Sequence, residues 1–404
     1  MQVYIGIDWS ENEHEVVWLN EHGRIIDHFS MAHRPDGFIK LEQARHRWGL
    51  TAAACAVALE TAHNLLVDFL WAWGYQQLYV IPPSVIKSNR GRFTSSGARD
   101  DQRDGHLIAE VLRTDGGRLQ PWSPDRPLTR QIRAKVSLIH YLTKQKVRCA
   151  NRLRTVLLRY YPAALQVFQQ WSSQISLAFM QQYPTPQAAA DLTWPDFEAF
   201  GRSHRYAATR LPACFARLKQ PQPQASSGTV AAYQAETAWL AGSLQSLIQA
   251  KNQALRDLAA LFAQHPDRAI FASLPGTGPL LAPALLSKFG DDRSRFPTPA
   301  SLQALAGTCP LTIRSGKRQV VKFRQACDRE FRHIGQQWAH HSLKTSVWAN
   351  AYWQQVRPRC SSHSHALRCL ANRWLAVAWK LWQTGQTYDQ AYHLRQRALR
   401  TKTR

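Results

Sequence analysis

Four carboxylates in the first part of the chain have the types and the spacing of a divalent-metal site. Asp8 ends one strand-like apolar segment and Glu60 ends another, whereas Asp101 and Asp104 stand three residues apart. Residues spaced i and i+3 share one face of a helix, so the second pair would project together. Several carboxylates are needed to hold two divalent ions against a phosphodiester undergoing displacement. Because clustered acids repel one another, the set predicts a metal site for phosphodiester chemistry.

The same acids also have ordinary structural explanations. Asp8 would cap a turn, Glu60 would be a surface acid, and the two later aspartates would add negative charge at a helix N-terminus. Asp100 competes with Asp101 for one ligand position. The spacing to Asp104 favours Asp101, so the predicted ligands are Asp8, Glu60, Asp101 and Asp104.

The elements that must position these acids follow an α/β pattern. Alternating and apolar segments predict five strands, at Val3–Asp8, His14–Asn20, Arg24–Met31, Ala54–Glu60 and Leu78–Ile81. Helices are predicted at Gly37–Trp48, Ala62–Trp73 and Asp101–Arg113, and residues 84–98 are interpreted as a loop or a weak helix. An antiparallel meander, a helix and a further strand would bring Asp8 and Glu60 to one edge of a ribonuclease-H-like sheet.

The remainder of the chain is predicted to be mainly helical. After a proline-marked linker, helical periodicity is sustained over Thr129–Tyr160 and again over Val230–Phe262, and prolines break residues 183–227 into an irregular insert. Two such helices predict an antiparallel arm or coiled coil that serves dimerisation, with an ordinary helical bundle as the alternative. We therefore expect an α/β domain (1–118), a helical arm (119–270) and a basic C-terminal domain (271–404).

The charge balance points to nucleic acid as the partner. The 404 residues carry a net charge of +24 at pH 7, and 45% of them are hydrophobic, which excludes a disordered basic tail. Residues 1–116 have a net charge of −4, and the rest of the chain has +28. Seven scattered cysteines without a CxxC pair indicate free thiols in a reducing compartment. Because we find neither a signal peptide nor a membrane span, we expect a cytoplasmic protein.

A glycine-rich turn offers a candidate contact with phosphate. Leu274-Pro-Gly-Thr-Gly278 has the form of a helix-hairpin-helix turn and precedes a predicted helix over Leu280–Phe289. Gly276 and Gly278 would let backbone N–H groups approach a phosphate at the helix N-terminus. The alternative is a plain Gly/Pro connection between two helices.

The acidic segments resemble a known family. Gly6-Ile7-Asp8, the strand-end Glu60 and the stretch Arg99-Asp-Asp-Gln-Arg-Asp-Gly105 resemble the RuvC-like domain of the DEDD transposases of bacterial insertion sequences, to which pilin-gene invertases are related. Family members usually show Lys-x-Asp-x-x-Asp-Ala, so this chain keeps the acids and changes their flanks. The resemblance implies that these four acids bind Mg²⁺, with Mn²⁺ as an alternative ion.

The C-terminal part resembles the transposase domain of the same family. Over residues 271–335 the shared motifs are Pro-Gly-x-Gly, Phe296, an Ala-Gly-x-x-Pro and the dipeptide Ser315-Gly316. In that domain the serine of the dipeptide is the nucleophile, which corresponds to Ser315. Cationic neighbours suit a phosphodiester under attack: Arg314, Lys317, Arg318, Lys322 and Arg324. No histidine adjoins Ser315, so metal or a residue from elsewhere would activate it, and Thr312 is the rival nucleophile.

The resemblance also implies a reaction and its partners. The enzyme would be a DNA transposase or recombinase that exchanges strands of double-stranded donor and target DNA through a 5′-phosphoserine link. A noncoding guide RNA made by the element, a bridge RNA, would pair with both DNAs. A homodimer or homotetramer would assemble each active site from two protomers, in the bacterial cytoplasm at the nucleoid. Residues 325–332 depart from the Gly-Asn and Leu-Arg that typically follow the serine.

Two other functions stay open on the sequence. A RuvC-like metal-dependent nuclease would hydrolyse branched DNA with water and leave Ser315 idle. A non-catalytic nucleic-acid-binding protein would use the acids only structurally and would need no magnesium. Full activity of an Asp8→Ala or Glu60→Ala variant would favour the second of these.

Two further groups of residues in the last part of the chain favour structural roles. Cys360, His363, His365 and Cys369 match no standard zinc-finger spacing, and the two histidines lie at i and i+2, which is poor for one helical face. We therefore expect an incidental grouping. The tryptophans of the C-terminal helices are expected to pack in a core more than to stack on unpaired bases.

Overall fold

The protein forms two compact units. The structure, a computed structural model, describes residues 2–61, 65–92, 101–316 and 318–402. The first unit comprises residues 1–125 and the second residues 126–404. The boundary falls inside the proline-marked segment predicted as a linker, and the division into three domains stays a prediction. Within the described ranges, no helix combines the length and the apolar character that a membrane crossing requires.

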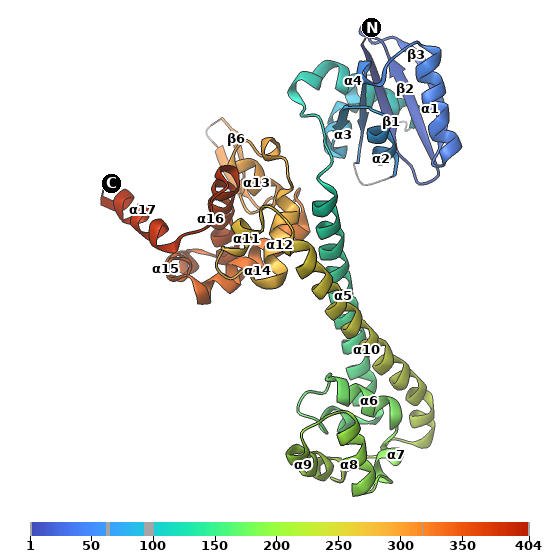
Figure 1. Cartoon of the computed structure of the whole chain (residues 1–404), viewed down its shortest axis with the longest axis vertical. Coiled ribbons are helices and arrows are strands. Elements are labelled where there is room, and N and C mark those ends of the chain that lie inside the picture. Colours follow the sequence, from blue (N-terminus) through green and yellow to red (C-terminus); the bar gives the residue numbers. More distant parts are fainter. Residues whose placement is uncertain (1, 62–64, 93–100, 317, 403–404) are drawn as a thin grey trace. The chain divides into compact units, whose positions relative to one another are not determined.

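The first unit is built on a mixed sheet, of which Figure 1 labels β1, β2 and β3. Its five strands have the order β3-β2-β1-β4-β5. An antiparallel meander is formed by β1 (Val3–Asp8), β2 (Glu13–Leu19) and β3 (Ile25–Ala32). Both β4 (Cys55–Leu59) and β5 (Gln77–Val80) extend the sheet in parallel with β1. The central strands β1 and β4 are the most apolar because both of their faces are covered.

Helices cover both faces of this sheet. On one face, α1 (Pro35–Arg47) and α2 (Leu65–Ala72) pack on Ile5, Val57 and Leu78. On the other, α3 (Pro83–Asn89) and α4 (Asp101–Asp115) pack on Ala56 and Ala58. A helix therefore forms over part of the segment interpreted as a loop or a weak helix, and residues 93–98 lie outside the described residues.

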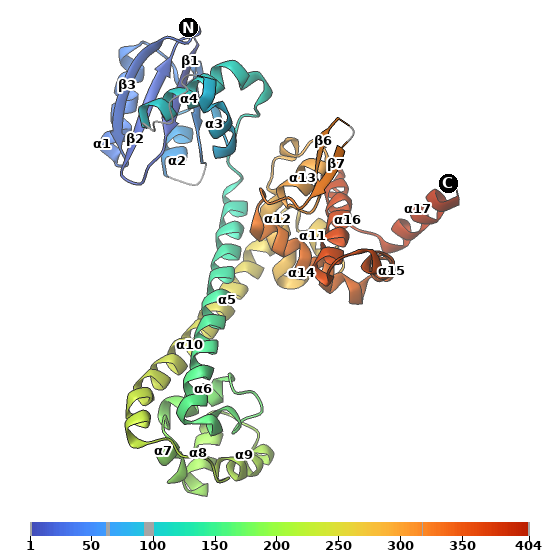
Figure 2. The same cartoon turned by 180° about the vertical axis from the view of Figure 1, so that it is seen from behind.

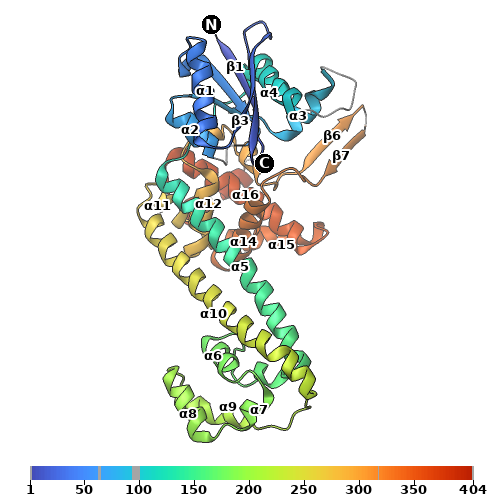
Figure 3. The same cartoon turned by 90° about the vertical axis from the view of Figure 1, so that its right-hand side faces the viewer.

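Two long helices form the middle of the second unit. They are α5 (Pro127–Tyr160) and α10 (Ser227–Ala263), which pack side by side (Figure 3). Lys135 pairs with Asp257 at 2.7 Å, and Arg152 with Glu236 at 2.6 Å. Residue numbers that rise on one helix while they fall on the other mean that the pair is antiparallel. The periodic segments of the sequence thus form an arm of two helices.

The segment between these helices is not the irregular insert that its prolines predicted. It contains α6 (Gln174–Gln182), α7 (Pro186–Ala190), α8 (Trp194–Ser203) and α9 (Leu211–Leu218). Pro186, Pro195 and Pro212 stand in the first turns of α7, α8 and α9, where the missing N–H is no loss. These helices close a separate apolar core with the adjoining ends of α5 and α10, centred on Phe179 and Phe197.

The last part of the second unit is helical apart from one hairpin. Its helices are α11 (Arg268–Ala272), α12 (Gly278–Phe289), α13 (Pro299–Leu305), α14 (Arg329–Thr345), α15 (Val347–Val356), α16 (His363–Thr384) and α17 (Gln390–Lys402). The hairpin is β6 (Leu311–Ser315) and β7 (Arg318–Lys322), and it projects from the helices (Figure 2).

Short 3₁₀ turns connect the elements of both units. They occupy Ala52–Ala54, Arg90–Arg92, Gly116–Arg118, Pro162–Leu165, Ala208–Arg210, Arg293–Arg295 and Arg357–Arg359. The predicted class, α/β followed by mainly α, is confirmed.

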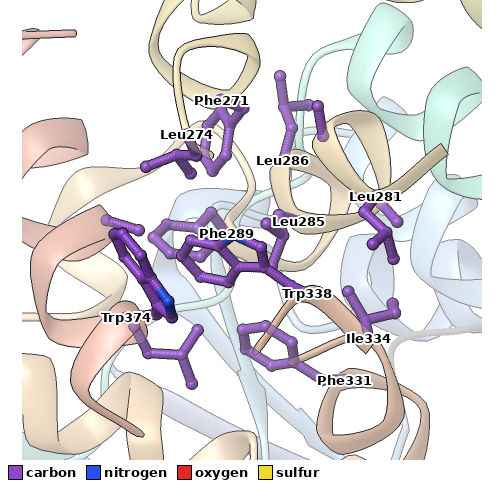
Figure 4. Packing of buried hydrophobic residues seen from close by; sticks show 14 of the residues in the cluster. Phe271, Leu274, Leu281, Leu285, Leu286, Phe289, Phe331, Ile334, Trp338 and Trp374 are labelled. Carbon is purple, nitrogen blue, oxygen red and sulfur yellow. The ribbon is translucent and has the colours of Figure 1, made fainter. Parts of the chain in front are cut away.

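Aromatic side chains fill the core of this helical part. Trp338 and Trp374 are fully buried and pack near Phe289 and Phe331 (Figure 4). Trp338 Nε1 donates to Pro275 O at 3.0 Å, and Trp374 Nε1 donates to Ser342 Oγ at 2.9 Å. The structural role expected for these tryptophans is confirmed.

A partly buried ion cluster ties three helices of this core together. Glu330 of α14 accepts from Lys288 of α12 at 2.7 Å and pairs with His140 of α5. The hydrogen bond from His140, followed by Lys288, lowers the pKa of Glu330 from its ordinary 4.5 to about 2. A carboxylate with a depressed pKa stabilises the folded state above its unfolded pKa, and this stabilisation is lost as the pH falls toward the folded pKa.

We expect Glu330→Gln to lower the free energy of unfolding by about 1–2 kcal/mol at neutral pH, since His140 loses its anionic partner and Lys288 loses Glu330 but keeps Asp328, at 2.9 Å. The difference between wild type and variant should shrink between about pH 5 and about pH 2, because the wild-type carboxylate becomes protonated there. Urea denaturation followed by tryptophan fluorescence at several pH values measures both effects. A difference that stays constant with pH would contradict this account.

Candidate active site

Asp8 and Glu60 reach the same edge of the sheet on neighbouring strands. The parallel ladder pairs Ile7 with Leu59, so the next residues, Asp8 and Glu60, are level with each other. Neighbouring strands lie about 4.8 Å apart, and cross-strand partners project from the same face. This brings two carboxylates together although 51 residues separate them in the sequence.

Two glycines bring α4 against that face. A Cβ added to Gly6 would lie 2.1 Å from Gly105 O and 2.4 Å from Ala109 N, so the backbone of α4 rests directly on β1. Gly105 in turn faces Val17 of β2, where an added Cβ would be 3.2 Å from Val17 Cγ2. Because residues two apart share a face of a strand, Asp8 projects toward the α4 side, as Gly6 does. The first turn of α4, which carries Asp104, therefore lies on the same side of the sheet as the Asp8 side chain.

The charge of Asp104 affects the pKa of Glu60. Burial raises the pKa of Glu60, the charge of Asp104 raises it further, and the charge of Arg90 lowers it. Arg90 makes a bidentate ion pair with Asp104: Nη2 donates to Oδ2 at 2.7 Å, and Nε donates to Oδ1 at 3.2 Å. Glu60 and Asp104 are thus near neighbours and Asp8 faces the same side of the sheet, but the oxygen atoms of the three carboxylates do not all lie within 4.8 Å of one another. Mg²⁺ and Mn²⁺ prefer oxygen donors of this type, so a bound ion would have to draw the three carboxylates together.

The fourth predicted ligand is only partly visible. Asp101 begins α4, one turn before Gly105, but its side chain lies outside the described residues, as does its rival Asp100. The role of Asp101 as a ligand therefore stays a prediction. The helix that the i, i+3 spacing required is present.

The structure adds two residues that the sequence analysis missed. Glu15 lies directly opposite Asp8 in the antiparallel β1–β2 ladder and hydrogen-bonds His28 at 2.9 Å. Arg90, which holds Asp104, stands in a 3₁₀ turn after α3. The sequence could have indicated Glu15. A hairpin that joins the first two predicted strands pairs Asp8, at the end of one, with a residue near the start of the other. Nothing in the sequence around Arg90 indicates its partner.

Ser315 lies at the end of β6, where the hairpin turns. Ser315 is paired with Arg318, and Gly316 between them has a φ of +55°, a conformation that glycine adopts without strain and that two-residue hairpin turns require. The side chain of Ser315 is exposed. Among the described residues no histidine or carboxylate hydrogen-bonds its hydroxyl, and Thr312 lies on the same exposed strand.

Most of the predicted cationic neighbours share this exposed hairpin or the segment that follows it. Arg314 lies beside Gln319 and donates to it at 3.1 Å, and Arg318 and Lys322 stand on β7. Arg324 follows the hairpin, with its carbonyl held by Arg332 at 2.8 Å. Lys317 lies outside the described residues. The hairpin therefore presents a serine among several cations.

The Pro-Gly-x-Gly turn joins α11 to α12 and has a structural reason for its first glycine. Gly276 has a φ of +81°, and a Cβ there would lie 2.6 Å from Ser342 N of α14. Gly278 has a φ of +56°, is exposed and opens α12 toward open space. Thr277 between them is buried and donates to Leu274 O at 2.8 Å. The turn is thus fixed on one side, and the start of α12 is open on the other.

We expect Gly276→Ala to destabilise the second unit by about 2–4 kcal/mol, through left-handed strain and a clash with the backbone of α14. Gly278→Ala should cost about 1 kcal/mol, because only strain applies there. Thermal unfolding of the two variants measures the difference. Equal losses would contradict the packing of Gly276 on Ser342.

Comparisons with known proteins bear on these two sites. A family model described as a transposase of the DEDD type matches residues 5–162. A second model, of the transposase IS116/IS110/IS902 family, matches residues 268–354. Together the two models match more than half of the chain. The chain belongs to the DEDD transposase family of insertion sequences.

Relatives extend this likeness along almost the whole chain. The mini-circle putative transposase for IS117 from Streptomyces coelicolor is 29% identical over 398 residues, 96% of each protein. The uncharacterized 44.8 kDa protein of insertion element IS116 from Streptomyces clavuligerus is 24% identical over 408 residues, 96% of this chain and 97% of the relative. The putative transposase y4uE of Sinorhizobium fredii is 27% identical over 217 residues, 52% of this chain and 59% of the relative.

The DEDD transposase models match the parts of the chain that hold both candidate sites. The first match includes Asp8, Glu60 and Asp104, and the second includes the Pro-Gly-x-Gly turn and Ser315. The family resemblance drawn from the motifs is therefore confirmed.

Proposed function

We propose that the chain is a DNA transposase that cleaves and joins the strands of an insertion sequence through a covalent phosphoserine intermediate. The observation that carries this proposal is the placement of Asp8 and Glu60 at the ends of neighbouring strands, with Asp104 of the overlying helix near Glu60. Repelling carboxylates are costly to gather without a cation, so their placement supports a metal site. The family membership supports DNA as the substrate.

The topology of the first unit supports a ribonuclease-H-like, RuvC-like interpretation. The order β3-β2-β1-β4-β5, with an antiparallel meander and two parallel strands, places the acids at the ends of the central pair. In the proposed site Asp8, Glu60 and Asp104, with Asp101, hold Mg²⁺ or Mn²⁺. Bound ions would supply Lewis-acid stabilisation of the phosphoryl oxygens. Arg90 neutralises Asp104 and has to share that carboxylate with the incoming ion.

Ser315 is the proposed nucleophile. Its Oγ forms a bond to the phosphorus of a DNA phosphodiester, the 3′-oxygen leaves as a hydroxyl, and the DNA 5′ end stays on the serine. A 3′-hydroxyl of the second DNA then attacks the phosphoserine and releases the serine. Arg318 is paired with Ser315 across the hairpin and would stabilise negative charge on the phosphoryl oxygens. The base that accepts the serine proton would come from outside the described neighbours of Ser315.

The wider nucleic-acid contacts of the proposed enzyme follow its charge. The chain outside residues 1–116 has a net charge of +28, enough for phosphate contacts to both DNA and RNA. The exposed start of α12 at Gly278 offers backbone N–H groups to a phosphate. We propose that donor DNA, target DNA and a noncoding guide RNA bind to this basic part, and that the α5–α10 arm serves a homodimer or homotetramer.

The test is a strand-transfer assay with DNA that carries the ends of the element, its guide RNA and Mg²⁺. The proposed enzyme joins donor to target, and Ser315→Ala abolishes joining, whereas the matched hydroxyl variant Thr312→Ala on the same strand retains it. Joining by Ser315→Ala at the wild-type rate would overturn the serine mechanism.

A metal-dependent nuclease is the second candidate function. The observation that favours it is the exposed Ser315 hydroxyl, which has no hydrogen bond to a base among the described residues. In the same assay a nuclease yields hydrolysed ends without joined products, and Ser315→Ala leaves its rate unchanged.

The guide RNA proposal predicts that RNA copurifies with the protein. When the chain is expressed with the DNA that flanks its gene, a discrete noncoding RNA from that flank should be recovered. Because phosphate contacts dominate such binding, its affinity should fall steeply with salt. Sequencing of the bound RNA checks this, and recovery of only random cellular RNA would contradict guidance.

A further inference from the structure

A group of metal-ligating side chains lies at the start of α16, outside both sites described above. Ligand atoms of Cys360, His365 and Cys369 all lie within 4.8 Å of one another. His365 and Cys369 are four residues apart on α16, so they share one helical face. Cys360 ends the 3₁₀ turn Arg357–Arg359 and reaches the same point from outside the helix.

The two histidines of this segment lie in different surroundings. His363 does not join the group: its ring lies 6.0 Å from that of His340 and 5.6 Å from that of Trp353. Without His363 the spacing becomes Cys-x₄-His-x₃-Cys, in which only His365 and Cys369 need a shared helical face. The three ligand atoms therefore gather at one point, which the spacing of the four residues did not indicate.

We propose that Cys360, His365 and Cys369 bind one Zn²⁺ ion, with water as the fourth ligand. Two thiolates and one imidazole are ligands that select zinc. Binding forms two Zn–S bonds and one Zn–N bond and releases the two thiol protons to solvent. Among the described residues no fourth His, Cys, Asp or Glu joins the group, which leaves the last position to water.

The hydroxyl of a neighbouring serine lies against the imidazole of the group. Ser361 Oγ lies 3.3 Å from His365 Nδ1, a contact that orients the ring as outer partners of metal ligands do.

The proposed ion would brace the base of the serine hairpin. Arg368, next to Cys369 on α16, lies over the ring of Phe323 at 4.6 Å, and Arg332 of α14 lies over the same ring at 4.4 Å. Phe323 directly follows β7 of the hairpin that carries Ser315. A metal that fixes the first turn of α16 therefore fixes one of the two guanidinium groups that hold Phe323.

The first test measures zinc in the full chain, expressed in zinc-supplemented medium, freed of any affinity tag and dialysed. Elemental analysis should find about one zinc ion per chain in the wild type. His365→Ala and Cys369→Ser should each lower that content at least about tenfold. The matched controls His363→Ala, two residues away, and Cys149→Ser, on the arm, should retain it. A wild type without zinc, or equal zinc in His365→Ala and His363→Ala, would overturn the proposal.

The second test identifies the ligands by spectroscopy and remains valid if a variant folds poorly. Cobalt-substituted wild type should show a thiolate-to-cobalt charge-transfer band, which should weaken in Cys360→Ser and be unchanged in Cys149→Ser. Mass spectrometry of the same preparation without reductant reports the redox state of the two cysteines. A Cys360–Cys369 disulfide in place of bound metal would overturn the zinc site.

Discussion

Replacing Asp8 by Asn should abolish metal-dependent cleavage of DNA, with a loss of at least about a thousand-fold in rate, or about 4 kcal/mol. Asn keeps the size of the side chain and removes the charge. Asp8 is level with Glu60 on the neighbouring strand and faces the side of the sheet that α4 covers. Its charge is therefore part of the acidic face, by which we mean Asp8, Glu60 and Asp104. Cleavage rates over a range of Mg²⁺ and Mn²⁺ concentrations measure the loss.

The matched control for this variant is Asp36→Asn. Asp36 stands in the first turn of α1 and makes an exposed ion pair with Arg34 at 3.6 Å. The control removes the same charge from the same unit and should keep the wild-type rate within about twofold. If Asp8→Asn cleaves as fast as Asp36→Asn, the acidic face does not carry the chemistry.

Gly6→Ala should lower the rate of cleavage by about a hundred-fold or more although the variant keeps all four predicted ligands. Its Cβ would lie 2.1 Å from Gly105 O and 2.4 Å from Ala109 N, which are backbone atoms that cannot rotate away. The helix α4 must then move off β1, and Asp104 moves with it, away from Asp8. Gly6 is therefore a positioning residue for the acidic face.

A positioning role predicts weaker metal binding together with slower cleavage. Titration calorimetry with Mn²⁺ should show the lower affinity, and circular dichroism should show that the helices are retained. Gly105→Ala is the matched control, because its Cβ would meet a side-chain atom, Val17 Cγ2 at 3.2 Å, with no backbone atom closer than 3.4 Å, and the family usually has alanine there. Equal metal affinity in Gly6→Ala and the wild type would contradict this role.

The strands and long helices were predictable because their patterns are local. Val3–Asp8 is apolar and ends in a charge, and the strand has those bounds in the structure. The proline-rich segment was misjudged because one residue type both ends and begins helices, and Pro186, Pro195 and Pro212 begin them. The β6–β7 hairpin was missed because all five residues of β6 are exposed, so no alternation of buried and exposed residues marks it.

The sequence indicated most residues of the candidate sites, but it did not indicate which side chains surround them. The order of strands and the acids at their ends indicated that Asp8 and Glu60 meet. The ion pair from Arg90 to Asp104 depends on how a turn folds back, which the sequence does not reveal. The same holds for Cys360, which reaches His365 and Cys369 from a turn outside their helix.

The most direct measurement of the central claim is to find the residue that carries DNA during the reaction. A nicked substrate that traps the intermediate, with Mg²⁺ and guide RNA, is incubated with the wild type, and the digested adduct is sequenced by tandem mass spectrometry. The account predicts a nucleotide on the peptide containing Ser315, through a 5′-phosphate, and no adduct in Asp8→Asn or Ser315→Ala. Cleaved DNA with free 5′-phosphates and no adduct, or an adduct at Thr312, would contradict it.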